Sequence, residues 1–338
     1  MRSLCIRVRK SEGESTRKKL LDAGVLDVGL KVGRNEDSVL LPVTSVPEGM
    51  DLLACEEDFE ERRLGETDYK KKVQLPDELR ELLPTSFDII GDIGIIRLPD
   101  ELVPYRNEVG RALKEVFPRL RTVALDAGVK GEYRVRDLEV IAGDPELETV
   151  HLEYGLRLYI DPSKAYFNPR LANERKRVAS LVQPGEFVVD MFAGVGPFAL
   201  MIAKYSQAQA VAAIDINHDA VELMRRNIAT NHITNVHPIE GDSRQAVFDL
   251  PCSDRLVMNL PHTAREFFAD ALTRLNFNGT MHLYHICERD EIGQVIDGLI
   301  TEALGMGVVV KVESLLELKT YSPTASVYAI DLRLVAWA

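Results

Sequence analysis

The sequence predicts an α/β protein with a mostly parallel seven-stranded sheet, preceded by two small α+β domains. From about residue 160, nearly continuous apolar stretches alternate with helical patterns, as in parallel strands that helices cover on both faces. Before that point, short alternating apolar runs accompany single helical patterns, which is typical of α+β modules. We therefore expect domains at 1–68, 69–160 and 161–338.

The first two regions each combine strand and helix patterns. Residues 1–68 contain a helical pattern that ends at Gly24, with strand patterns at 4–10 and 38–43. Residues 69–160 contain a hairpin through Gly91-Asp92, then a helix and two strands at 105–117, 122–126 and 132–143. We expect the acidic segment 56–72 to be a linker or a surface helix.

The third region predicts the large sheet. Its strand patterns lie at 187–192, 210–217, 236–242, 255–261 and 281–287. Helical patterns follow them at 197–206, 219–231, 243–248, 263–275 and 289–304. The last two apolar stretches, 308–318 and 327–336, can pair as a closing hairpin.

The charge of the chain is unevenly distributed. With 53 acidic and 41 basic residues the net charge is −12, a sum that argues against a nucleic-acid-binding protein. Segments 1–19, 111–136 and 157–177 are nevertheless rich in Lys and Arg. Solvated helix faces are the usual explanation of such runs. A substrate motif beside one of them would favour phosphate contacts instead.

The cysteines and the hydropathy pattern indicate a cytoplasmic protein. None of the four cysteines, Cys5, Cys55, Cys252 and Cys287, forms a CxxC pair, so we expect free thiols and neither a zinc site nor a disulfide framework. The N-terminus lacks the apolar core of a signal peptide, and no stretch is long enough to span a membrane. We expect no membrane partner and no bound metal.

The segment DMFAGVGPF, residues 190–198, lies where the first parallel strand turns into its helix. Gly194 and Gly196 allow a tight turn and the close approach of a ligand to the backbone. The segment lacks the third glycine of the dinucleotide fingerprint, and Asp190 before the turn would repel a pyrophosphate. Asp190 suits a cationic ligand, such as a sulfonium or an amino group.

Polar residues end the next three parallel strands. Asp215 is placed to accept ribose hydroxyls, Asp242 with Ser243 to receive an adenine amino group, and Asn259 follows the fourth strand. Helix capping is the alternative for the acidic residues: Asp242 with Ser243 could simply cap the helix that follows, and Asp215 alone fits a cap as well as a ligand. Together, DMFAGVGPF, AIDIN, EGDS and NLPH resemble the class I, Rossmann-like, S-adenosylmethionine-dependent methyltransferases. This resemblance implies S-adenosyl-L-methionine as cofactor, with ligand residues Arg175, Asp190, Phe192, Gly194, Gly196, Asp215, Ile216, Asp242, Ser243 and Asn259.

The segment NLPH, residues 259–262, resembles the motif of methyltransferases that act on amino groups or ring nitrogens of bases. A strand-end Asn-x-Pro turn is the structural alternative. Residues 131–143 and 161–178 are similar to the archaeal and eukaryotic tRNA (guanine-37-N1)-methyltransferases, and a looser resemblance covers the N-terminal region. The family implies methylation of N1 of guanine 37, and binding of the anticodon loop and body of tRNA.

The resemblance also implies roles for single residues. N1 of guanine carries a proton that a base must remove, and Glu174 matches the base of the family, with a solvated residue in an Arg-rich helix turn as the alternative. Arg134 matches the donor to O6 of guanine, a role that Arg136 could also fill. Tyr166 and Phe192 are candidates to stack on the base, with core packing as the alternative for Phe192. Asn259 and Pro261 would complete the catalytic set.

Several alternatives remain open from the sequence. NLPH alone does not choose the atom, so N2 of guanine, N6 of adenine or a wyosine intermediate are other substrates. A tRNA-binding protein without activity is the alternative from a different class. The segment Tyr321–Pro323 resembles a loop of the family, without an assigned role. We expect a monomer.

Overall fold

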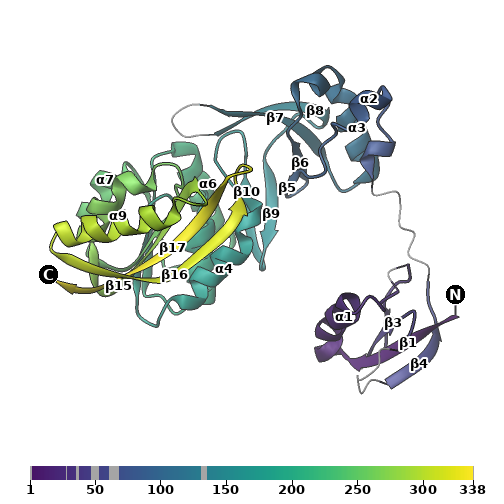
Figure 1. The fold of residues 1–338 in the computed structure, drawn as a ribbon, viewed down its shortest axis with the longest axis horizontal. Helices are drawn as coiled ribbons and strands as arrows, with labels where there is room; N and C mark the ends of the chain where they lie inside the picture. The colour runs from purple at the N-terminus through teal and green to yellow at the C-terminus, as the bar shows by residue number, and fades with distance from the viewer. Residues whose placement is uncertain are drawn as a thin grey trace. The chain divides into compact units, whose positions relative to one another are not determined.

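The computed structural model describes residues 2–27, 29–35, 38–46, 53–60, 68–130 and 135–337. The chain forms two compact units, Met1–Lys71 and Lys72–Ala338, and Figure 1 shows their secondary structure. The further division expected at residue 160 stays a prediction. Among the described residues, no helix combines the length and the apolar character needed to cross a membrane.

The first unit is a four-stranded antiparallel sheet with one α-helix, α1 (Gly13–Asp22). The strand order is β2-β3-β1-β4, with β1 (Arg2–Arg9), β2 (Gly33–Arg34), β3 (Ser38–Pro42) and β4 (Leu53–Asp58). Leu20 of α1 packs against Ile6 and Leu41 of the sheet. The expectation of a linker or surface helix at 56–72 is wrong over its first residues, because these pair with β1 as part of β4.

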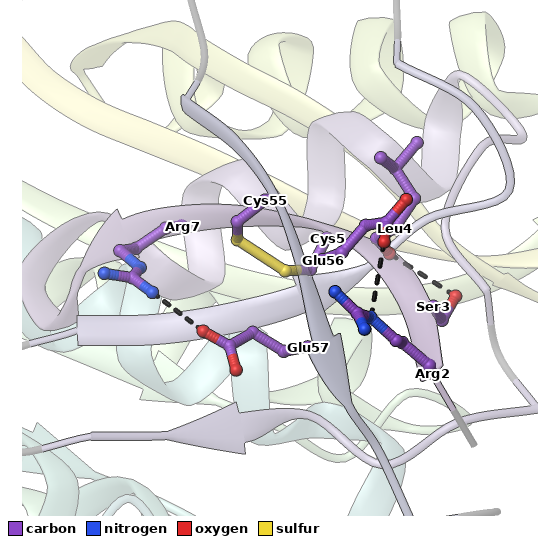
Figure 2. The surroundings of a disulfide bond; sticks show 8 residues. All are labelled: Arg2, Ser3, Leu4, Cys5, Arg7, Cys55, Glu56 and Glu57. Carbon is purple, nitrogen blue, oxygen red and sulfur yellow. Dashed lines mark hydrogen bonds and ion pairs between the residues drawn. A yellow bond between two sulfur atoms is a disulfide. The ribbon is translucent and has the colours of Figure 1, made fainter.

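Cys5 and Cys55 form a disulfide bond, which corrects the expectation of four free thiols. The register of β1 and β4 places the two cysteines directly opposite each other, with their Cα atoms 5.1 Å apart, within the range that a disulfide spans. Figure 2 shows the bond between the Arg7–Glu57 and Arg2–Glu56 ion pairs. Cys252 and Cys287 are free.

The second unit begins with a small α+β part. Its sheet has the order β5-β6-β7-β8, with β5 (Asp88–Ile90), β6 (Ile93–Ile96), β7 (Thr122–Lys130) and β8 (Val135–Gly143). The predicted hairpin through Gly91-Asp92 and the predicted helix, α3 (Arg106–Val116), are confirmed. A shorter helix, α2 (Asp77–Arg80), precedes them.

A two-stranded hairpin, β9 (Thr149–Glu153) and β10 (Leu156–Ile160), follows and was not expected from the sequence. Thr149 of this hairpin donates a hydrogen bond to Asp92 at the β5–β6 turn, over 2.7 Å between Oγ1 and Oδ1. The hairpin is therefore joined directly to the small α+β part.

The seven-stranded sheet that the sequence predicts is confirmed. Its order is β13-β12-β11-β14-β15-β17-β16. Among these described strands, β17 alone runs in the direction opposite to the other six. The strands are β11 (Phe187–Asp190), β12 (Ala210–Asp215), β13 (Val236–Glu240), β14 (Ser253–Met258), β15 (Leu275–Glu288), β16 (Val308–Thr320) and β17 (Ala325–Trp337). The closing hairpin is the β16–β17 pair.

Helices cover both faces of this sheet (Figure 1). The alternation of Val188 and Val189 on β11 illustrates the two cores, because Val188 packs with α4, α5 and α6, whereas Val189 packs with α8 and α9. The helices are α4 (Ala172–Leu181), α5 (Pro197–Tyr205), α6 (His218–Thr230), α7 (Ser243–Ala246), α8 (Phe268–Thr273) and α9 (Ile292–Gly305). Both faces are therefore buried, as the continuous apolar strands predicted.

Candidate active site

A cavity of about 740 Å³ opens at the carboxyl ends of β11, β12 and β14. Most of the site residues predicted from the sequence line it: Tyr166, Arg175, Phe192, Gly194, Asp215, Ile216, Asp242, Ser243, Asn259 and Pro261. Asp190, Gly196, Glu174 and Arg136 are close by in the fold but do not line it. Arg134 lies outside the described residues.

The turn after β11 is held by Asp215. The backbone N–H of Gly194 donates to Asp215 Oδ2 over 2.6 Å, and that of Asn217 donates to Oδ1 over 2.9 Å. Gly196 has φ +85°, and a Cβ there would lie 2.6 Å from Leu200 Cδ1. Burial raises the pKa of Asp215. Asp215 therefore combines two tasks, since it fixes the glycine turn and also faces the cavity.

Asp190, the last residue of β11, is fully buried, and neither of its carboxylate oxygens has a hydrogen-bond partner among the described residues. Burial raises its pKa to about 7, and the charge of Asp215 contributes in the same direction. Buried carboxylates are normally satisfied by donors or by a cation. An unsatisfied one beside the cavity fits a positively charged ligand, as expected for a sulfonium or an ammonium group.

Asp242 and Ser243 show that capping and cavity lining coexist. Asp242 is the N-cap of α7, and its Oδ1 accepts a hydrogen bond from the Arg244 N–H over 2.9 Å. Ser243 donates to the carbonyl of Met191, which joins α7 to the end of β11. Both residues line the cavity. The capping alternative is thus correct, and it leaves the ligand role in place.

Aromatic side chains gather around Asn259 and Pro261. Phe192 stacks edge-on against Phe267, with ring centroids 4.9 Å apart, and both rings line the cavity. Tyr321 makes a similar contact with His262 at 5.5 Å and is 54 % exposed. The carbonyl of Pro261 accepts the Ile286 N–H over 3.1 Å, which fixes the NLPH segment to β15. Flat rings at the cavity suit an unstacked base.

Two basic residues that the sequence assigned to solvent or to phosphate are held in ion pairs, Arg136 partly buried and Arg175 fully buried. Arg136 is held by Asp88 at 2.9 Å and by Asp126 at 3.1 Å. The guanidinium of Arg175 lies against Glu153, with nitrogen–oxygen distances of 2.8 and 2.5 Å, and is 1 % exposed as a residue. Neither solvated helix faces nor phosphate contacts describe Arg175, so that expectation of segment 157–177 is wrong for this residue.

Glu174 lies in α4 and is buried, so its alternative as a solvated residue is wrong. Its Oε1 accepts from the Tyr284 hydroxyl over 2.7 Å, and both oxygens accept from the Arg177 guanidinium over 2.7 Å. Arg175 of the same helix and Leu171, its N-cap residue, line the cavity, and Glu174 itself does not. The general-base role of Glu174 stays a prediction.

Comparisons with known proteins cover the entire chain. Residues 149–303 match the TRM5/TYW2 methyltransferase domain, residues 71–146 the TYW2 N-terminal domain, and residues 5–51 the tRNA methyltransferase 5 N-terminal domain. Over 333 residues, 98% of this chain and 99% of the relative, the sequence is 41% identical to the tRNA (guanine(37)-N(1))-methyltransferase Trm5b of Pyrococcus abyssi. The chain belongs to the TRM5/TYW2 methyltransferase family.

Solved structures of TRM5/TYW2 methyltransferases have the same fold. The crystal structure of wild-type Trm5b from Pyrococcus abyssi matches with a TM-score of 0.76 and 40% identity, covering 99% of this chain and 100% of that chain. The complex structure of aTrm5 and tRNALeu matches with a TM-score of 0.69 and 30% identity, covering 98% and 100%. The resemblance and the fold class expected from the sequence are thereby confirmed. The expected S-adenosylmethionine cofactor is confirmed as well, since the solved structure of the family member M. jannaschii TYW2 is a complex with AdoMet.

The cavity of this TRM5/TYW2 methyltransferase is also lined by residues that the sequence motifs did not indicate. Arg97, Lys319 and Tyr321 line it although they come from distant parts of the chain. Burial lowers the pKa of Lys319, and the charge of Arg170 contributes in the same direction. The Tyr321–Pro323 resemblance pointed to Tyr321 without a role. Nothing local in the sequence distinguishes Arg97 or Lys319 from other surface cations.

Proposed function

We propose that the protein transfers a methyl group from S-adenosylmethionine to N1 of guanine 37 in the anticodon loop of tRNA. The observation that carries the proposal is one cavity in which Gly194 and Asp215, at the carboxyl ends of β11 and β12, meet the NLPH segment. A sulfonium donor supplies an activated methyl group. The enzyme therefore has to bind that cation, orient the base and remove one proton.

The residues at the carboxyl ends of β11 to β13 form the donor half of the site. Asp215 accepts the ribose hydroxyls, and Asp242 with the adjacent backbone receives the adenine amino group. Asp190 attracts the positive charge of the donor, because a cation is the partner that its buried oxygens lack. The exposed backbone of Gly194 allows close contact, since an added Cβ would meet only the Tyr166 carbonyl, at 3.5 Å.

The residues around Asn259 form the acceptor half. Asn259 offers both an amide donor and an acceptor to the edge of the base, and Pro261 stiffens the segment. Tyr166, 46 % exposed at the cavity, provides a ring on which the unstacked base rests. Arg97 and Lys319 are placed to contact RNA phosphates. Arg134 is proposed as the donor to O6 of guanine.

Glu174 is proposed as the general base. It lies in α4 next to the cavity-lining Arg175, and its carboxylate is the group that the family resemblance assigns to this task. Catalytic hydrogen bonds are commonly long before the substrate binds. One bridging water would therefore carry the proton from N1 to a Glu174 oxygen.

The experiment that tests the function uses purified protein, labelled donor and a tRNA transcript with G37. We expect methyl incorporation, and digestion followed by mass spectrometry should identify N1-methylguanosine. A transcript with another base at position 37 is the matched control and should remain unlabelled. Labelling of that control, or a product methylated at N2, would contradict the proposal.

The protein is also proposed to act as a monomer in the cytoplasm. Light scattering after size-exclusion chromatography, with and without tRNA, tests the monomeric state. A dimer that persists at the concentrations of the assay would overturn it.

A further inference from the structure

A continuous chain of buried and partly buried polar side chains begins at Glu174 in α4 and runs over strands β17, β15 and β14. We call it the Glu174 network, and its members come from α4, β14, β15, β17 and the turn before β11. They are Glu174, Arg177, Glu186, Arg255, His282, Tyr284 and Asp331.

Arg177 joins Glu174 to Asp331. While Nε and Nη2 donate to the Glu174 oxygens, Nη1 donates to Asp331 Oδ2 over 2.7 Å, and Nη2 also reaches Oδ1 at 3.2 Å. Burial would raise the pKa of Asp331, but hydrogen bonds from His282 and Arg177 outweigh it and hold the pKa at about 2. Asp331 therefore stays anionic and keeps Arg177 in place.

His282 joins Asp331 to Arg255 in one defined tautomer. Arg255 Nη1 lies 2.8 Å from His282 Nε2, and a guanidinium can only donate, so Nε2 accepts and the ring proton is on Nδ1. That Nδ1 donates to Asp331 Oδ1 over 2.6 Å. Burial lowers the pKa of His282, in agreement with a neutral ring. Arg255 is fixed in turn by Glu186, at 2.7 and 2.9 Å.

Tyr284 is the second direct partner of Glu174. Its side chain is fully buried, and burial, with the neighbouring Glu174 charge, raises its pKa well above the ordinary value. The hydroxyl is therefore a donor at every working pH. The ring packs against Phe198, with centroids 5.7 Å apart, and Phe198 lines the cavity. Tyr284 thus lies between the candidate base and the wall of the substrate cavity.

Stability alone does not account for this arrangement. Buried ion pairs rarely stabilise a fold more than apolar side chains of the same volume, because desolvation offsets their attraction. What a fully satisfied buried network does provide is a single, rigid arrangement. Here that arrangement ends at the carboxylate proposed as the base.

We propose that Tyr284 and the Arg177–Asp331 pair are positioning residues for methyl transfer, which hold the Glu174 carboxylate at one place. This rests on the proposed function, in which Glu174 takes that proton. In the step, the N1–H bond breaks and the proton goes to a Glu174 oxygen. The nitrogen electron pair forms the bond to the methyl carbon, and the carbon–sulfur pair returns to sulfur.

Substitutions of Tyr284 and of Asp331 should shift the pH dependence of the methyl-transfer rate in opposite directions. Tyr284→Phe removes a donor to the anion, so the midpoint of the pH–rate profile should move to higher pH. Asp331→Asn removes a nearby negative charge, and Glu174 then remains the only carboxylate of the pair that Arg177 neutralises. The midpoint of the pH–rate profile should therefore move to lower pH. The groups that face Glu174 are Arg177 of α4, Tyr284 and His282 of β15, Asp331 of β17 and, through His282, Arg255 of β14.

The test measures single-turnover methylation of the G37 transcript across pH for the full-length variants, with donor binding and thermal unfolding measured alongside. We expect Tyr284→Phe to slow transfer about 10-fold, the effect of one lost hydrogen bond to a charged group. Donor affinity should not change. Tyr328→Phe is the matched control, because Tyr328 is a buried tyrosine of the neighbouring strand β17 outside the Glu174 network.

A double-mutant cycle with Glu174→Gln separates the outcomes. If Tyr284 acts through Glu174, Tyr284→Phe should cause no further loss in the Glu174→Gln background. Additive losses, or a pH profile that neither Tyr284→Phe nor Asp331→Asn moves, would overturn the inference and leave Glu174 as the base. A Glu174→Gln variant that transfers methyl at the normal rate would instead refute the base assignment, and the inference with it.

Discussion

The charged side chains of the Glu174 network and the Asp190 carboxylate differ in how completely hydrogen bonds satisfy them. In the Glu174 network, each carboxylate accepts hydrogen bonds from at least one guanidinium. Asp190, at the end of β11, is fully buried and receives no side-chain donor among the described residues, and the backbone N–H of Phe192 only partly offsets the effect of burial on its pKa. The network is complete within the protein. A bound cationic ligand would supply the partner that Asp190 lacks. The contrast therefore distinguishes charges that hold side chains of the site in place from a charge that would bind the methyl donor.

Neutralising Glu174 should produce the largest effect. Glu174→Gln removes the proposed base, and base catalysis contributes about 10²–10⁴-fold, so single-turnover transfer should fall by that factor. Binding of S-adenosylmethionine should be unchanged, because Arg177 and Tyr284 already satisfy the Glu174 carboxylate within the protein. Rapid-quench kinetics measures the single-turnover rate, and calorimetric titration measures the binding of S-adenosylmethionine. A rate close to that of the wild type would place Glu174 among purely structural charges.

Asp190→Asn should stabilise the protein without ligand. The folded pKa of about 7 lies above the ordinary 3.8, so Asp190 makes folding less favourable as pH rises from about 4 to 7, by at most about 4 kcal/mol. The amide removes this cost. Thermal unfolding should therefore show a larger gain for the variant near pH 8 than near pH 5.

The same substitution should weaken donor binding. Binding of the cation should also weaken in the wild type as pH falls below about 7, where Asp190 becomes protonated. Leu299→Met, a volume-conserving change in α9 at a buried residue that does not line the cavity, serves as the control for general packing effects. If Asp190→Asn destabilised the protein at all pH values, Asp190 would have a partner and the contrast would fail.

Asp215 is intermediate between the two groups, because backbone donors satisfy it and it also faces the cavity. Asp215→Ala should lower donor affinity roughly 100-fold, as expected for two hydrogen bonds to a charged group. The affinity for tRNA should change much less. Equilibrium titrations with each ligand test this, and a greater loss of tRNA binding would mean that the donor half of the site is wrongly placed.

The sequence predicted the large sheet well because its strands are continuous in the chain and apolar. It failed at α4, where Glu174 and Arg175 are buried although charge in a helix normally indicates solvent. The motifs on β11, β12 and β14 were found because each is a local signal at a strand end. The carboxylate–backbone contact of Asp215 with Gly194 follows from the same local geometry.

Contacts between distant segments left no local signal. Cys5 and Cys55 are 50 residues apart, and only the register of β1 and β4 brings them together. Arg177 and Asp331 are 154 residues apart, and their ion pair joins α4 to β17. Such pairs depend on strand order and register, which the periodicity of single segments does not specify.

Asp331 gives the smallest expected effect and the most direct test of the contrast. Its folded pKa of about 2 lies below the ordinary 3.8, so it stabilises the folded state above about pH 4, and this contribution is lost as pH falls towards 2. The difference corresponds to roughly 2 kcal/mol. Denaturant unfolding should therefore show Asp331→Asn less stable than the wild type at about pH 7, with the gap narrowing at about pH 3. Asp190→Asn should show a gain that grows with pH, so equal trends for both variants would mean that the two groups of charges do not differ.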